Sequence, residues 1–289
     1  MKKVIALDIG GTNLRGAIIN DKYEIEKVII RDNDCFGNKE RFYSKILAII
    51  DELYSLSPEN ICCFSAGLPG RVRKSGKVDD LSNVKIKDID LVTILQEKYK
   101  LPVFIKNDAE MALLSEAFLG AGKKYDGVYF VTISTGIGGA FCYKKQLKNY
   151  GKESGHTPIY YQGEFKDFER LCSGTGIVNL AKINGLEVKC AKDFFDLLKE
   201  NNEKAVKIKE EWLNLLSEQF QFINSVFMPD VFTLTGGVMK SKDLFFEELK
   251  EKNKNLNIVE CQSGQYAGLI GAACLGFNKI SEKEEGSTL

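Results

Sequence analysis

Two glycine-rich turns, each beside apolar runs, constrain this chain more than any other feature of its sequence. The first, residues 8–12, lies between the apolar runs 4–7 and 17–19, and the second, residues 134–139, follows the run 128–131. Each pattern is typical of two strands joined by a tight turn. Such a turn exposes backbone N–H groups, and glycine lets the backbone come close to an anion. Two related turns in one chain predict a duplicated domain, with a polyphosphate held between the copies.

Asp8 gives the first turn a further meaning, because it ends the apolar run. A carboxylate beside a phosphate-binding turn suits Mg²⁺, which is usually held through water since this ion dehydrates reluctantly. The structural alternatives are also open. A Gly-Gly pair between strands is the ordinary sequence of a hairpin turn, and a turn aspartate often bonds its own backbone.

Composition limits the class of protein. The 289 residues suffice for two domains, and 44% are hydrophobic, so we expect a sizeable core rather than disorder. Lys plus Arg equals Asp plus Glu, at 40 each, which argues against nucleic acid as the main partner. No apolar run is long enough to span a membrane, and the first residues lead into a strand rather than a signal peptide. The eight cysteines form no C-x-x-C pair and predict buried thiols of a cytosolic protein.

Strands and helices alternate along both halves, so the predicted class is α/β. The expected strands after the first hairpin cover residues 27–31, 61–65, 102–105 and 231–235. The expected helices cover residues 39–56, 89–99, 108–119 and 266–277, with a mostly helical stretch over 165–227. Residues 281–289 are expected to form a loose polar tail.

Three further loci carry candidate chemistry. Asn107 and Asp108 stand at a strand-to-helix junction, where both residue types are preferred N-caps. The functional alternative makes Asp108 a general base, since phosphoryl transfer to an alcohol needs a group that accepts the hydroxyl proton. His156 is the single histidine of the chain, and a lone histidine is most often structural. Glu169, taken alone, would be a surface glutamate on a helix.

Together these loci resemble the ROK family of sugar kinases, within the hexokinase/actin-like superfamily. The resemblance runs from residue 3 to about residue 276, nearly the whole chain. Residues 8–12 and 132–140 resemble the two phosphate motifs of the family, and residues 107–108 its sugar-and-base motif. Residues 153–156 resemble its E-x-G-H motif, whose Glu and His bind sugar hydroxyls.

The resemblance implies a role for each matching residue. It makes Asp108 the catalytic base and Asp8 the carboxylate that holds Mg²⁺ through water. The residues implied for ATP are Asp8, Gly10, Gly11, Thr12, Thr135, Gly136, Gly138, Gly139, Gly236, Gly237 and Gly268. Those implied for the sugar are Gly67, Asn83, Asn107, Asp108, Glu153, His156 and Glu169.

One departure from the family concerns zinc. Most members carry a C-x-C-G-x-x-G-C zinc cluster after the E-x-G-H motif, whose histidine is commonly a ligand too. Residues 157–168 contain no cysteine here, and a structural zinc site needs about four ligands. We therefore predict that zinc is absent, and that an apolar cluster holds His156 by packing. The expected members of that cluster are Tyr160, Tyr161, Phe165 and Phe168.

The implied fold has two actin-like, ribonuclease H-like domains flanking a cleft. The smaller domain is expected to cover residues 1–107 and to be completed by a C-terminal helix at about 268–289, with the larger over 108–267. The implied reaction is ATP- and Mg²⁺-dependent phosphorylation of the 6-hydroxyl of an amino sugar, by a cytoplasmic homodimer with no membrane or nucleic-acid partner. The short, zinc-less sequence is most similar to bacterial N-acetylmannosamine kinases of sialic acid catabolism.

Three alternatives stay open. A glucokinase or fructokinase would keep the same machinery. A repressor of the same family would need a DNA-binding domain before the first hairpin, for which residues 1–3 leave no room. A catalytically silent sugar sensor would have little reason to keep both Asp8 and Asp108.

Overall fold

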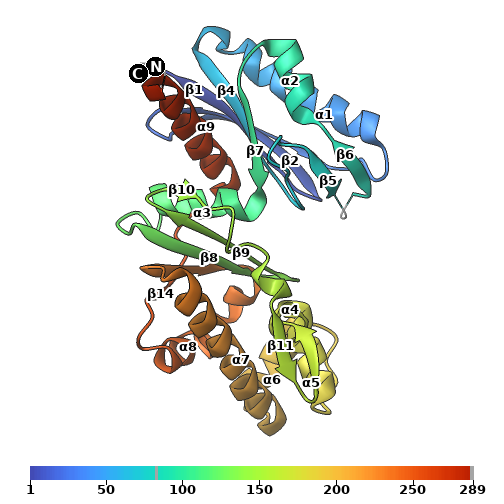
Figure 1. The fold of residues 1–289 in the computed structure, drawn as a ribbon. Helices are drawn as coiled ribbons and strands as arrows, with labels where there is room; N and C mark the ends of the chain where they lie inside the picture. The colour runs from blue at the N-terminus through green and yellow to red at the C-terminus, as the bar shows by residue number, and fades with distance from the viewer. Residues whose placement is uncertain (82–83, 287–289) are drawn as a thin grey trace. The chain divides into compact units, whose positions relative to one another are not determined.

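A computed structural model describes residues 1–81 and 84–286, which fall into two compact units (Figure 1). Unit 1 is Met1–Phe118 with Ser263–Leu289, and unit 2 is Leu119–Gln262. The sequence analysis ended the first domain at residue 107, whereas unit 1 also includes the helix that follows. Each unit is built on a five-stranded sheet.

The sheet of unit 1 has the strand order β3-β2-β1-β4-β7. Its strands are β1 (Lys3–Ile9), β2 (Asn13–Asn20), β3 (Ile25–Asp32), β4 (Ile61–Leu68) and β7 (Val103–Asn107). The first three form an antiparallel meander, while β4 and β7 add to β1 in parallel. The carboxyl ends of β1, β4 and β7 therefore lie at one edge of the sheet.

Helices cover both faces of this sheet, with α1 on one face and α9 on the other (Figure 1). The helices and smaller elements are α1 (Lys39–Ser55), the 3₁₀ turn η1 (Pro58–Asn60), the hairpin β5 (Val78–Leu81) and β6 (Ile86–Ile89), α2 (Leu91–Tyr99), α3 (Asp108–Phe118) and α9 (Ala267–Gly286). Helix α1 begins where the Asn38 side chain accepts the N–H of Arg41, and its residues 42, 46, 49, 50 and 53 are buried at helical spacing.

Helix α3 belongs to unit 1 because it packs against α9. Glu116 is buried, and its Oε1 accepts the N–H of Ser263 at 2.6 Å, where the chain returns to unit 1. The Ser115 and Ser263 hydroxyls also bond at 2.9 Å. The expectation of a loose tail from residue 281 is wrong for residues 281–286, because α9 runs on to Gly286.

The sheet of unit 2 repeats the plan of the first, with the order β10-β9-β8-β13-β14. Its strands are β8 (Gly127–Ile133), β9 (Ile137–Tyr143), β10 (Gln146–Leu147), β13 (Val231–Thr235) and β14 (Ile258–Glu260). Again three antiparallel strands are extended by two parallel ones. This repetition confirms the predicted α/β class and the duplicated hairpin.

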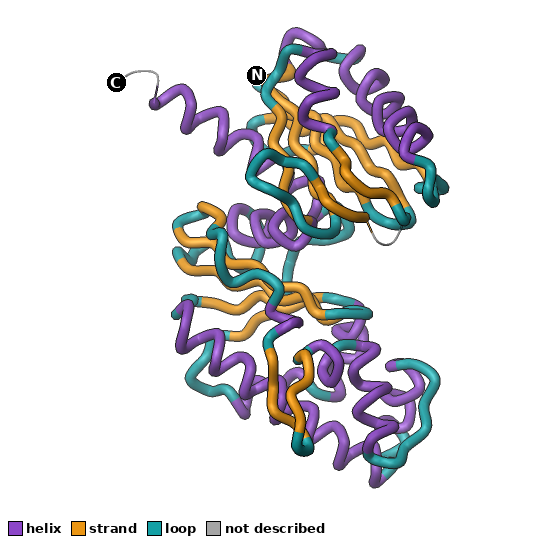
Figure 2. Tube along the Cα trace, turned by 45° about the vertical axis from the view of Figure 1, so that its right-hand side comes forward, coloured by secondary structure: helices purple, strands orange, loops and turns teal. Residues whose placement is uncertain are grey.

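The core of unit 2 lies between its sheet and a layer of helices (Figure 2), and Trp212 is fully buried in it. The helical elements are η2 (Ser154–His156), α4 (Glu169–Cys172), α5 (Gly174–Ile183), α6 (Ala191–Lys199), α7 (Glu203–Phe227), η3 (Gly237–Leu244) and α8 (Phe246–Lys252). Residues 165–167 are not helical as expected but form β12 (Glu164–Asp167), which pairs with β11 (Pro158–Tyr161). No helix within residues 1–81 and 84–286 has both the length and the apolar character needed to cross a bilayer.

Candidate active site

The carboxyl edge of the first sheet places Asp8 at the end of β1 and Asp108 just after β7, on either side of β4. Asp8 pairs with Gly67 of β4, and Gly67 in turn pairs with Lys106 of β7. A Cβ on Gly67 would lie 3.7 Å from the Cα of Asp108 and 2.8 Å from the Met111 side chain. The absence of a side chain at Gly67 thus lets the start of α3 lie against the sheet edge. Ligands of open α/β sheets bind at such strand ends.

The Asp8 carboxylate is largely buried and has two neighbours. Its Oδ2 accepts a hydrogen bond from Arg15 at 3.0 Å, and Arg15 also donates to the Gln265 carbonyl. A Cβ on Gly268, in the first turn of α9, would lie 2.7 Å from the Asp8 carboxyl carbon. Burial raises the pKa of Asp8, while the Arg15 charge opposes that rise. A carboxylate oxygen suits Mg²⁺, and only glycine leaves room for it beside α9.

Asp108 is the first residue of α3, and its side chain is exposed. The neighbouring Asn107 fixes the turn, since its Oδ1 accepts the N–H of Ala109 at 2.8 Å and its Nδ2 donates to the Gly70 carbonyl at 2.9 Å. Asp108 Oδ1 also accepts the Ala109 N–H at 2.8 Å. The positive end of the helix dipole favours the ionised carboxylate that a base requires.

The backbone of the first turn presents free donors. Asn33 holds the turn from behind, because its N–H donates to the Thr12 carbonyl and its Nδ2 to the Gly10 carbonyl, both at 2.7 Å. Within residues 1–81 and 84–286, the N–H groups of Gly11 and Thr12 donate to no backbone carbonyl. Two unpaired N–H groups in a turn are suited to bind phosphate oxygens.

The second turn is tied to Glu169. The Ile137 N–H donates to Glu169 Oε2 at 3.0 Å, and a Cβ on Gly136 would lie 2.7 Å from that same oxygen. The turn is closed by a hydrogen bond of 2.8 Å, which the Ser134 N–H donates to the Gly136 carbonyl. Glu169 was predicted only as a sugar ligand, but in the structure one of its oxygens also orders the turn predicted to bind phosphate.

A third glycine-rich segment lies beside the second turn. Gly236 follows β13 with φ of +111°, and a Cβ there would lie 2.2 Å from the Ile133 carbonyl oxygen. The next N–H, from Gly237, donates to Ser134 Oγ at 3.0 Å. Only glycine tolerates both the dihedral angle and the contact, so this segment and the second turn are held side by side.

A cavity of about 840 Å³ opens next to these two segments in unit 2. Thr135 and Gly237 both line it, together with the start of α5 and residues of α6 and η3. Its volume lies in the range of small-ligand sites. Its cationic side chains suit a polyanionic nucleotide, and they are Lys189, Lys192, Lys199 and Lys240. Cys190 also lines it and is exposed, so the expectation that all cysteines are buried is wrong there.

The other predicted sugar ligands of unit 2 gather around His156. The imidazole Nδ1 lies 3.9 Å from Glu169 Oε1, and the Nε2 lies 4.0 Å from Glu153 Oε2. The His156 and Glu153 side chains are both exposed, at 59% and 67%. The side chains of Glu153, His156 and Glu169, which can all hydrogen-bond to hydroxyls, thus lie close together at a solvent-accessible position.

The remaining predicted residues lie as follows. Gly138 and Gly139 are in strand β9, paired with Thr132 and Val131. A Cβ on Gly139 would meet Ser154 Oγ at 2.4 Å, so this glycine lets η2 pack on the strand. Asn83 lies outside the described residues.

The residues around His156 do not fit the zinc site of the resembled family. The interval without cysteine forms the β11–β12 hairpin, and no group of three or more possible metal ligands occurs among residues 1–81 and 84–286. The predicted apolar cluster is half right. Tyr161 and Phe168 are buried, whereas Tyr160 and Phe165 are exposed and meet edge to face, with ring centroids 5.3 Å apart.

The absence of zinc stays a prediction with a direct test. The purified protein should contain no stoichiometric zinc by elemental analysis, because His156 lacks thiolate neighbours. A zinc-selective chelator should leave activity intact while Mg²⁺ is in excess. About one tightly bound zinc per chain would contradict the prediction.

Sequence reasoning missed three groups that the structure places at these sites. Arg15 faces Asp8 across the first hairpin, and the antiparallel register of its two strands was a usable signal. Ser134 joins two turns far apart in the sequence, and the lysines around the cavity come from separate elements. Neither of the last two leaves a local sequence pattern.

The comparisons with known proteins agree over nearly the whole chain. A model of the ROK family matches residues 4–278. The glucokinase of Thermotoga maritima is 25% identical over 96% of this chain and 98% of its own length. A xylose repressor of Bacillus subtilis is 31% identical over 53% of this chain and 39% of its own.

Solved structures show the same fold. The ROK hexokinase of Thermus thermophilus aligns with a TM-score of 0.84 and 22% identity, over 97% of this chain and 99% of that one. A candidate N-acetylmannosamine kinase of Listeria monocytogenes aligns with a TM-score of 0.77 and 24% identity, over 96% and 99%. At these identities the structures show the actin-like sugar-kinase fold and nothing finer.

Proposed function

The chain belongs to the ROK family, and for this sugar kinase we propose transfer of the γ-phosphate of ATP to the 6-hydroxyl of N-acetylmannosamine. The product would be N-acetylmannosamine 6-phosphate. We further propose that the enzyme acts in the cytoplasm as a homodimer, in the breakdown of sialic acid.

The observation that carries the kinase assignment is the pair of carboxylates at one sheet edge. Asp8 is largely buried beside Arg15 and α9, whereas Asp108 is exposed at the start of α3. Two carboxylates in different environments can perform different tasks. A sensor that only binds a sugar would need neither arrangement.

Each unit supplies part of the proposed machinery. In unit 1, Asp108 accepts the proton of the sugar hydroxyl as its oxygen attacks the γ-phosphorus, and Asp8 holds the hydrated metal. Mg²⁺, when bound, offsets negative charge on the phosphates. In unit 2, the turn at Thr135 and the lysine-lined cavity bind the nucleotide. Glu153, His156 and Glu169 bind the sugar hydroxyls, and Asn107 positions the start of α3.

The choice of N-acetylmannosamine has separate and narrower support. The stretch that carries cysteines in most of the resembled family is a cysteine-free hairpin here, which is a feature of some bacterial N-acetylmannosamine kinases. The Listeria monocytogenes protein described as a candidate for that activity shares the fold at 24% identity. Glucose is the alternative substrate, because the chain is also similar to the glucokinase of Thermotoga maritima.

A substrate comparison tests this choice. We expect kcat/KM for N-acetylmannosamine to exceed that for N-acetylglucosamine, glucose, mannose and fructose under one set of conditions. A sugar with a mismatched hydroxyl leaves a polar group of the site unpaired, which costs roughly 1–3 kcal/mol, or more where that group is charged. If glucose or fructose is preferred by about tenfold, or about 1.4 kcal/mol, the amino sugar is the wrong acceptor although the kinase assignment stands.

A further inference from the structure

The β11–β12 hairpin is anchored to the core of unit 2 by its buried side. Tyr161 donates its hydroxyl to Glu211 Oε1 at 2.7 Å, and burial together with this bond raises the pKa of Tyr161 to about 12. Thr157 Oγ1, just before the hairpin, accepts from Gln219 Nε2 at 3.0 Å, and Phe168, just after it, is buried. Both ends of the hairpin are therefore fixed, and a side chain on it can hold a neighbour in place.

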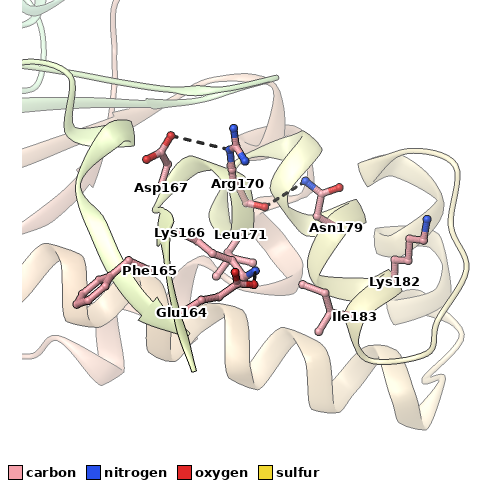
Figure 3. A pocket seen from close by; sticks show the side chains of 9 residues that line it. All are labelled: Glu164, Phe165, Lys166, Asp167, Arg170, Leu171, Asn179, Lys182 and Ile183. Carbon is pink, nitrogen blue, oxygen red and sulfur yellow. Dashed lines mark hydrogen bonds and ion pairs between the residues drawn. The ribbon is translucent and has the colours of Figure 1, made fainter. Parts of the chain in front are cut away.

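Asp167, the last residue of β12, is the carboxylate nearest to the His156 ring. Its Oδ2 lies 3.5 Å from His156 Nδ1, compared with 3.9 Å for Glu169 Oε1. Glu169 already accepts the Ile137 N–H with its other oxygen. Arg170 Nε lies 3.9 Å from the same Asp167 oxygen, an ion pair that Figure 3 draws as a dashed line. The charged groups near the His156 ring are thus Glu153, Asp167 and Glu169, and Arg170 is paired with Asp167.

We propose that Asp167 is a positioning residue for His156, which holds the proton on Nδ1 and leaves Nε2 without one. The carboxylate oxygen of Asp167 lies 3.5 Å from Nδ1, and a negative charge beside one imidazole nitrogen favours the tautomer that carries its proton there. The Asp167 carboxylate on the hairpin would thereby orient the His156 ring, a task that a bond to a metal ion can also perform. The inference rests on the proposed function in one respect, because it takes a sugar hydroxyl as the donor that hydrogen-bonds to Nε2.

This arrangement determines what His156 offers to a ligand. With the proton on Nδ1, neutral His156 presents an acceptor at Nε2, alongside the acceptor oxygens of Glu153 and Glu169. The three groups would then all receive hydroxyl protons from the sugar. The loss of the Asp167 carboxylate beside Nδ1 should raise the KM for the sugar about tenfold, with a smaller change in kcat.

The test uses the fact that His156 is the only histidine among 289 residues. Protein labelled with ¹⁵N-histidine gives one set of imidazole signals, whose shifts distinguish the two neutral tautomers. Spectra are recorded at the alkaline plateau, where the imidazole signals no longer change with pH. The variants are Asp167→Ala, Asp167→Leu and, as a control on the same strand, Glu164→Ala. Fluorescence of Trp212, the single tryptophan, checks that unit 2 is folded.

We expect the wild type and Glu164→Ala to show the Nδ1–H tautomer, and Asp167→Ala to move toward Nε2–H. Asp167→Leu provides the same comparison should the alanine variant fail to fold, because a side chain of similar size carries no acceptor. An unchanged tautomer in the folded Asp167 variants would overturn the inference. The spectra need no substrate, so they decide the question even if the protein phosphorylates no sugar, a result that would defeat the proposed function alone.

Discussion

Asp108→Asn should lower kcat by about 10²–10⁴-fold while leaving the fold intact. The amide keeps the size of the side chain at the start of α3 but accepts no proton from the sugar hydroxyl. Helix capping should survive, because Asn107 Oδ1 already accepts the Ala109 N–H at 2.8 Å. Steady-state kinetics with a coupled ADP assay, together with circular dichroism, measures both effects.

Asp90→Asn is the matched control for this experiment. Asp90 caps α2 in the same unit, where its Oδ1 accepts the Thr93 N–H at 3.1 Å, and it has no role in the proposed chemistry. The kcat of the Asp90→Asn enzyme should equal that of the wild type. A loss below about tenfold in Asp108→Asn, with unchanged circular dichroism, would make Asp108 a structural residue.

Asp8→Asn should reduce kcat by about a hundredfold or more and weaken the response to Mg²⁺. The substitution removes the negative charge beside Arg15 and the start of α9, and with it the group proposed to hold the hydrated metal. The measurement is the initial rate as a function of Mg²⁺ concentration at saturating ATP and sugar.

Asp21→Asn controls for the loss of one carboxylate in the same unit, since Asp21 is exposed in the turn after β2. That variant should keep the wild-type Mg²⁺ response. If Asp8→Asn keeps it as well, Asp8 serves only as the partner of Arg15, and another group must hold the metal.

The backbone plan could be predicted because it depends on local patterns. The strand expected at residues 231–235 is β13 as observed, because most of its residues are the β-branched and aromatic types that favour strands. The helical prediction was wrong at its start, because residues 165–167 belong to strand β12 and Phe165 is exposed. The tail was wrong at residues 281–286, where charged side chains continue a helix begun by buried ones.

The site was predicted only in part, because it depends on contacts between distant segments. The places of Asp8 and Asp108 at strand ends are visible in the sequence, whereas their roles stay predictions. The second role of Glu169, on the Ile137 N–H, and the approach of Asp167 to His156 depend on how two turns and a hairpin pack. The spacing of these residues in the sequence does not indicate that they are close in space, so the contacts of Glu169 and Asp167 could be found only in the structure.

The identity of the product tests the central claim most directly. After incubation with ATP, Mg²⁺ and N-acetylmannosamine, phosphorus–proton correlation NMR should show a phosphomonoester coupled to the C6 methylene protons, with one ADP formed per sugar consumed. Inorganic phosphate as the sole product, or phosphate on any other sugar carbon, would contradict the account.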